Sequence, residues 1–172
     1  MSDQFDSVNE AIRDHLVARY PLIEATASDG LRLPLGKAGG RRIWIRLGAR
    51  PGERAFLRAT VAVRANEGDA LPAWMSSLAD AAQRMSPTSL RGALEPVARE
   101  VPDFDQFQLV PPTRSTVDKC WQWGPVVYTY KDAPPSMRAA SRCVAAMLDA
   151  IRPLVAIHVP GAAGVVEPAQ AP

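Results

Sequence analysis

Two stretches of alternating apolar and polar residues decide the fold expected for this chain. Residues 41–47 read Arg-Arg-Ile-Trp-Ile-Arg-Leu, and residues 56–64 read Phe-Leu-Arg-Ala-Thr-Val-Ala-Val-Arg, with a Pro-Gly turn at 51–52 between them. Residues 31–35 alternate in the same way and lead into a glycine-rich turn at 36–40. Alternation bounded by glycine and proline is typical of antiparallel strands with one buried face. The pattern predicts a three-stranded meander.

A helical periodicity precedes the meander, and another follows it. Apolar residues recur at spacings of three and four over residues 8–20, and Ser7 and Glu10 have the spacing of a capping box. A second apolar stripe covers residues 136–151, and Pro153 is expected to end that helix. The two stripes predict an N-terminal and a C-terminal helix, each with one face against the sheet.

The middle of the chain combines helical and strand patterns. Pro87, Pro96 and Pro102 interrupt a helical period, so two short helices, or one helix and a loop, are expected there. Strand patterns return in three short segments, residues 107–110, 117–123 and 126–130. The expected fold class is therefore α+β. An antiparallel sheet, made of the three-stranded meander plus later strands, is packed by an N-terminal helix, a helical middle and a C-terminal helix.

Length and composition fit one globular domain. A chain of 172 residues with 47% apolar and 22% charged residues can bury a core without disulfide or metal support. Residues 1–160 are expected to form a single α+β domain. Residues 161–172, rich in glycine, alanine and proline, are expected to form a disordered tail. Cys120 and Cys143 match no metal-ligand or redox spacing and are expected to be buried thiols.

The first residues and the apolar runs bear on where the protein works. The first six residues are polar and acidic, unlike a secretory signal. No apolar run reaches the length needed to cross a bilayer. We therefore expect a cytoplasmic protein that has no membrane contact.

The residues that carry most enzyme chemistry are scarce. The sequence has neither a phosphate-binding glycine loop followed by Lys and Ser or Thr, nor a nucleophile elbow. His15 and His158 are its only imidazoles, and His15 borders the apolar stripe of the first helix. Asp103 and Asp105 alone are too few for a calcium or magnesium loop. We predict a protein that is not an enzyme and has no catalytic residues, no metal site and no cofactor.

The distribution of charge is the most informative feature. Residues 31–65 contain nine basic residues and one acidic residue, Glu53, which gives this segment a net charge of +8. The rest of the chain carries about −6, so the overall charge of +2 conceals a strongly polarised molecule.

Strand alternation predicts where that charge lies. If the Ile and Leu residues of the meander face the core, then an aromatic and basic set faces outward. This set is Arg42, Trp44, Arg46, Phe56, Arg58 and Arg64. A hairpin closed over residues 51–53 places Arg46 opposite Arg58, and like charges in that position are unfavourable. The outward face is therefore expected to need a cover.

Three covers are consistent with the sequence. Acids of the first helix, Glu10 and Asp14, or acids of the middle segment can neutralise the arginines within the fold. A second protein can supply an acidic and apolar segment, for which Arg and Trp are typical anchors. Single-stranded nucleic acid can place phosphates on the arginines and bases on Trp44 and Phe56. Trp121 and Trp123 are expected to fill the core, or to extend the aromatic surface if their strand lies at an edge.

The order of elements resembles the type III secretion chaperone-like fold, which also includes related bacterial proteins of sensory-transduction type. The residues that carry the resemblance are the helix over 8–20, the meander strands over 41–47 and 56–64, and the closing helix over 136–151. The resemblance implies a non-catalytic homodimer that binds a segment of another protein across its sheet and helices.

We therefore predict a protein-binding module, chaperone- or adaptor-like, whose basic and aromatic sheet face binds a partner with an acidic and apolar segment. The alternative is a single-stranded nucleic-acid-binding protein that uses the same face.

Overall fold

The chain folds as an antiparallel sheet with helices packed on one face. The computed structural model describes residues 2–27, 29–84 and 89–167. The strands within these residues are β1 (Glu24–Thr26), β2 (Gly30–Ala38), β3 (Arg41–Arg50), β4 (Phe56–Arg64), β5 (Phe104–Ser115) and β6 (Cys120–Thr129). The helices are α1 (Ser2–Leu16), α2 (Ala73–Gln83), α3 (Leu90–Arg99), α4 (Met137–His158) and α5 (Ala163–Val166). The predicted α+β class is confirmed.

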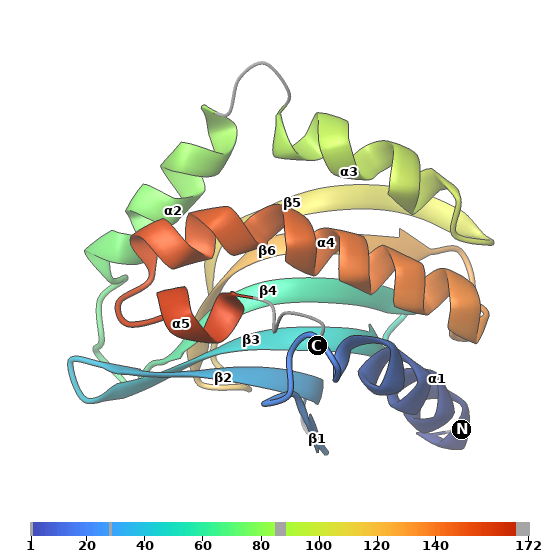
Figure 1. Cartoon of the computed structure of the whole chain (residues 1–172), viewed down its shortest axis with the longest axis horizontal. Coiled ribbons are helices and arrows are strands. Elements are labelled where there is room, and N and C mark those ends of the chain that lie inside the picture. Colours follow the sequence, from blue (N-terminus) through green and yellow to red (C-terminus); the bar gives the residue numbers. More distant parts are fainter. Residues whose placement is uncertain (1, 28, 85–88, 168–172) are drawn as a thin grey trace.

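The sheet is one continuous six-stranded layer in the order β1-β2-β3-β4-β6-β5. Helix α4 crosses β3 and β4, α1 packs against β2 and β3, and α2 and α3 lie over β5 (Figure 1). Side chains on this face, such as Leu33, Ile45 and Val61, share one core with Ile12 of α1 and Val144 of α4. In the described part of the chain, no helix covers the other face, and no helix is both long and apolar enough to span a bilayer.

The central meander is the predicted one, with a different register between its second and third strands. Arg46 pairs with Thr60 and not, as predicted, with Arg58. Strand β3 continues to Arg50, which pairs with the first residue of β4, so the connection between the strands is longer than predicted. A shift of two residues keeps each side chain on its predicted face, because the side-chain period of a strand is two.

The predicted helices are present with different ends. Helix α1 begins at Ser2 and not at the predicted capping box, because Phe5 continues its buried stripe, and it ends at Leu16. Helix α4 runs through Pro153, where it was expected to end, because Leu154 and Val155 continue the buried face. The helical middle forms two short helices, α2 and α3.

Three further segments complete or correct the sequence prediction. Strand β1 was not predicted, and the segments predicted over 117–123 and 126–130 belong largely to one strand, β6. Part of the segment predicted as a disordered tail is folded: α5 follows Ala162, and Ala162 and Val166 are fully buried. The residues after 167 lie outside those described. Cys120 and Cys143 are buried free thiols, as predicted.

Asn9 fastens α1 to the sheet. Its buried side-chain amide donates to the Ala49 carbonyl oxygen at 2.9 Å and accepts from the Ala49 N–H at 2.7 Å. Gly48 makes room for this contact: its φ is +107°, and a Cβ there would lie 2.4 Å from Asn9 Oδ1. Because a buried amide must find partners, the pair Asn9 and Gly48 fixes where α1 crosses β3.

Candidate functional site

The six predicted partner-binding residues do not form one exposed face. Trp44, Arg46 and Arg58 point to the helix-free face, but only 5%, 2% and 6% of their surfaces are exposed. The prediction that these three side chains are open to a partner is therefore wrong. Turns of the same chain cover them.

Asp29, in the turn between β1 and β2, covers the centre of the face. Its carboxylate accepts hydrogen bonds from Trp44 Nε1 and Arg46 Nε, both at 2.9 Å, and lies 3.7 Å from the Arg58 guanidinium. Arg58 Nη2 also donates to the Asp29 carbonyl oxygen at 3.3 Å. Asp29 is itself only 3% exposed. The cover of the centre is thus internal, which was one of the three alternatives.

A second acid comes from the turn between β5 and β6. The Asp118 carboxylate accepts from Arg46 Nη2 at 2.9 Å, and Gln122 Oε1 accepts from Arg46 Nη1 at 3.0 Å. The two acids that the sequence suggested on the first helix, Glu10 and Asp14, are exposed, and neither forms an ion pair with a described residue. The neutralising acids therefore sit in turns and not on the first helix.

The buried cluster holds more positive than negative charge. Asp29 also lies 3.9 Å from Arg32, so three guanidinium groups share this carboxylate. Burial and the neighbouring Arg46 lower the pKa of Arg58 to about 9. Burial opposes the charge on Arg46 as well, but Asp29 and Asp118 raise its pKa above the ordinary value. The position of each arginine thus depends on the carboxylates.

The Arg46–Asp118 pair predicts a specific response to acid. Burial opposes ionisation of Asp118, but the hydrogen bond from Arg46 lowers its pKa below the ordinary 3.8. A carboxylate with a lowered folded-state pKa stabilises the fold above the unfolded pKa, and this contribution is lost as pH falls through the folded pKa. We therefore expect Asp118→Asn to be less stable than wild type at neutral pH. The difference should shrink below about pH 4. Urea unfolding over a pH series measures this, and a constant difference would contradict it.

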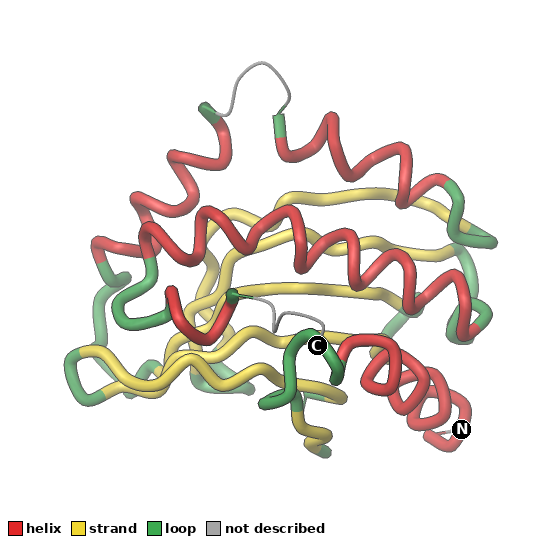
Figure 2. The backbone as a smooth tube through the Cα atoms, in the orientation of Figure 1, coloured by secondary structure: helices red, strands yellow, loops and turns green. Residues whose placement is uncertain are grey.

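The other three predicted residues lie at opposite ends of the sheet. Phe56 is half-buried beside the turn between β3 and β4, with its ring 5.9 Å from that of Tyr128. Arg42 is exposed and Arg64 is half-buried, and both lie toward the β2–β3 hairpin. That hairpin projects from one end of the sheet, close to the start of α2 (Figure 2). Only Arg42 and Arg64 are therefore both accessible and close to each other.

A bowl of about 410 Å³ opens beside Arg64. Its apolar wall comes from the end of β4, the start of α2 and the start of β6, and its polar rim comes from β3, β4 and the segment before α2. The tryptophan bowl is defined here by Val63, Pro72, Trp74 and Trp121 in the wall and Arg41, Arg64 and Asp69 at the rim. Both indoles are half-buried, so each presents a part of its surface to a ligand.

Hydrogen bonds fix the rim of the bowl. Arg41 binds the Asp69 carboxylate through Nε at 2.8 Å and Nη2 at 3.2 Å. The bond from Arg41, with one from the Asn66 N–H, lowers the pKa of Asp69. Trp121 Nε1 and Arg114 Nη1 both donate to the Asp69 carbonyl oxygen, each at 3.3 Å. The segment before α2 and the Trp121 indole are thereby held in place, so the bowl is preformed.

The sequence did not predict that these two indoles line the same bowl. Trp121 and Trp123 were expected to fill the core, or to extend the aromatic surface if their strand lay at an edge. The fully buried tryptophan of that strand is Trp123, at 1% exposed. Strand β6 lies between β4 and β5 and is not an edge. The position of Trp74 in the sequence could have indicated its partial exposure. It directly follows Pro72 and Ala73 at a helix start, where no preceding helical turn can bury it.

Comparisons with known proteins give no assignment. A scan of protein-family models, a search of curated proteins and a search of solved structures each found no match. Among the residues that the structure describes, no group of three or more His, Cys, Asp or Glu side chains is placed to hold a metal ion. The function therefore has to be inferred from the geometry of the site.

Proposed function

We propose that this protein is a non-enzymatic, chaperone- or adaptor-like module that binds an extended segment of another protein. An apolar side chain of that segment occupies the tryptophan bowl, and acidic neighbours pair with basic side chains around it. The observation that carries the proposal is the preformed bowl, which Trp74, Trp121 and Arg64 line together. Trp and Arg are the residues most enriched among the anchors of protein interfaces.

The charge around the bowl favours an acidic partner. Five basic residues lie at this end of the sheet, on four different strands: Lys37, Arg41, Arg42, Arg64 and Arg114. The one acid at the rim of the bowl, Asp69, is already bound by Arg41. Complementary charge raises the rate of association and suppresses wrong partners more than it adds affinity.

Two contacts next to the buried arginine cluster hold the Arg64 side chain in place. The Arg64 guanidinium lies 5.3 Å from the centre of the Trp44 ring, and its Nη1 donates to the Asp118 carbonyl oxygen at 3.2 Å. A guanidinium held in this way loses little conformational entropy when a carboxylate binds it. Of the six residues predicted to contact the partner, Arg64 lines the bowl and keeps that role in the proposal.

The order of elements on which the resemblance to type III secretion chaperone-like proteins rests is present in the fold. The proposal includes what that resemblance implies, which is a bacterial-type, cytoplasmic homodimer. Sedimentation equilibrium of the full chain tests the dimer, and a monomer at micromolar concentration would count against that part.

A single-stranded nucleic acid is the second candidate ligand. Its bases stack on indoles and its phosphates pair with arginine, so the same two tryptophans and Arg64 favour it. The two ligands differ in their response to salt, because phosphate contacts release counterions and lose affinity steeply as salt rises. An interface anchored by apolar side chains loses much less.

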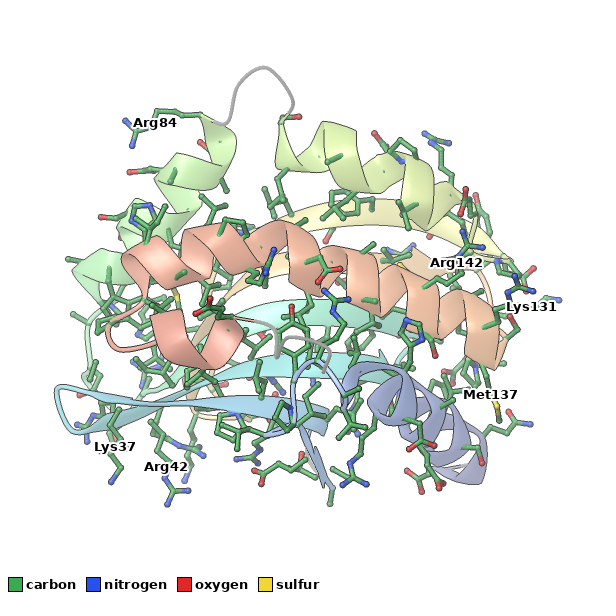
Figure 3. All side chains as sticks on the ribbon, viewed as in Figure 1. Lys37, Arg42, Arg84, Lys131, Met137 and Arg142 are labelled. Carbon is green, nitrogen blue, oxygen red and sulfur yellow. The ribbon has the colours of Figure 1, made fainter. Side chains whose placement is uncertain are left out.

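The test uses a peptide and a nucleic acid as probes. A random peptide library displayed on phage is selected on the wild-type protein, and one selected peptide is then titrated by calorimetry. We expect selected peptides to place an aromatic or large aliphatic residue next to acidic residues. Trp74→Ala should weaken binding at least roughly tenfold, as for an interface anchor. Arg84→Glu, an exposed charge change at the opposite end of α2 from Trp74, should leave binding unchanged (Figure 3).

Three outcomes contradict the proposal. Selected peptides that bind Trp74→Ala as tightly as wild type would place the site elsewhere. Selected peptides that lack acidic residues would show that the basic rim does not contribute to binding. Tighter binding of fluorescent oligothymidylate than of any peptide, with a steep loss of affinity in salt, would favour the nucleic-acid alternative.

A further inference from the structure

A second pocket lies on the other side of the β2–β3 hairpin, along the edge of β2. Strand β1 pairs only with the first three residues of β2, so the rest of that edge is not covered by it. The pocket beside this edge has a volume of about 230 Å³ and is called the edge pocket. Three basic side chains and one acid line it, together with an indole: Arg32, Lys37, Arg42, Glu24 and Trp44.

Lys37 and Arg42 are direct cross-strand partners. Like charges in that position repel each other unless an anion lies between them. Neither side chain forms an ion pair with any residue that the structure describes, and both extend from the hairpin toward the same side of the molecule (Figure 3). This pair is therefore free to share an external anion.

Arg32 brings a third, already positioned cation to the pocket. Its guanidinium lies 5.8 Å from the Trp44 ring, and its Nε is 3.8 Å from Glu24 and 3.9 Å from Asp29. Those distances are too long for hydrogen bonds, and Arg32 Nε is buried with no partner among the described residues. Asp29 is occupied by Trp44 and Arg46, so it does not satisfy Arg32.

Protection of the sheet edge explains only part of this arrangement. Lysine and proline on an edge strand prevent pairing with another sheet, and Lys37 and Pro34 fit that role. It does not explain why Arg32 and Arg42, from neighbouring strands, line the same pocket.

We propose that the edge pocket binds a dianionic phosphate group between Lys37, Arg42 and Arg32. The three cations and the carboxylate of Glu24 leave about two positive charges, and a phosphate monoester carries about −1.5 to −2 at pH 7. A single carboxylate balances only half of that. The site goes beyond the proposed peptide binding and does not depend on the tryptophan bowl, since the two share no lining residue.

Amide chemical shifts of the labelled full-length protein test this site directly. On titration with inorganic phosphate, the amides of Lys37 and Arg42 should shift and saturate, and sulfate should do the same. Phosphate should bind more weakly at about pH 5 than at about pH 8, because it takes up its second negative charge between these two pH values, whereas sulfate binding should change little. Absence of saturable shifts at these two residues would overturn the proposal.

Variants separate the site from general attraction of anions. Lys37→Gln and Arg42→Gln change exposed side chains and should fold normally, yet each should weaken phosphate binding at least roughly tenfold. Arg84→Gln should bind phosphate as wild type does. Equal weakening in all three variants would overturn the proposal. Failure of peptide binding at the bowl would leave the site intact, because Trp74→Ala should not change phosphate affinity.

Two phosphate sources can be told apart with the same measurement. Glycerol 3-phosphate represents a small phosphorylated metabolite, and a short peptide with a central phosphoserine represents a modified protein. Both should shift Lys37 and Arg42, and the tighter ligand shows the source. Binding of the unphosphorylated peptide with equal affinity would contradict a phosphate site.

Discussion

Replacing Asp29 with alanine is expected to lower the free energy of unfolding by about 3–5 kcal/mol, the range for removing one partner of a buried charge pair. The change leaves Arg46 and Arg58 buried without their shared carboxylate, and it leaves the Trp44 indole N–H without its acceptor. Domains of this kind have a total stability of about 5–15 kcal/mol, so the loss is a large fraction of it. Urea unfolding followed by circular dichroism measures the change.

Matched variants show whether the loss comes from the buried charge. Asp14→Ala removes an exposed acid and should stay within about 0.5 kcal/mol of wild type. Arg58→Met removes the guanidinium whose pKa is lowered and should be tolerated far better than Asp29→Ala. In the double variant the two losses should not add, because Arg58 is one of the charges that Asp29 compensates. A loss for Asp29→Ala no greater than for Asp14→Ala would show that the cluster does not stabilise the fold.

The sequence predicted which strand side chains face the core and which face away from it. It did not predict which residues cover the outward face. Alternation correctly placed Arg46 and Arg58 on the face that points away from the core. The register differs from the predicted one by two residues, and a shift of two leaves each side chain on the same face of the sheet. The register itself depends on the length of the connection after Arg50, which composition alone does not determine. The cover depends on Asp29 and Asp118, which lie in turns and reach the arginines only through the tertiary fold.

The sequence likewise predicted only part of the candidate site: its basic residues, but not its aromatic wall. The excess of basic residues in the meander identified Arg42 and Arg64, both of which remain accessible. Trp74 and Trp121 are separated by most of the helical middle and β5, and a bowl between them exists only because β6 pairs with β4. No local pattern in a single sequence encodes that pairing, so the aromatic half of the site required the structure.

The pairing of β6 with β4 makes Gly124 the second position at which a small change should have a large effect. Its φ is +150°, and a Cβ there would lie 2.6 Å from the Ala59 carbonyl oxygen and 2.9 Å from the Thr60 Cα. These neighbours are backbone atoms and cannot rotate away. Gly124→Ala is therefore expected to cost about 2–5 kcal/mol, combining about 1–2 for the strained backbone with about 1–3 for overpacking.

Gly39→Ala provides the matched control, since Gly39 also has a positive φ, +58°, but an added Cβ there meets no atom within 4 Å. It should cost only the strain, about 1–2 kcal/mol. If Gly124→Ala costs no more than Gly39→Ala, then β6 does not approach β4 as closely as described. Gly124→Ala should also weaken peptide binding more than Gly39→Ala does at equal folded concentration, because a displaced β6 moves Trp121 in the wall of the tryptophan bowl. Strand packing and recognition thus depend on the same close approach of two backbones.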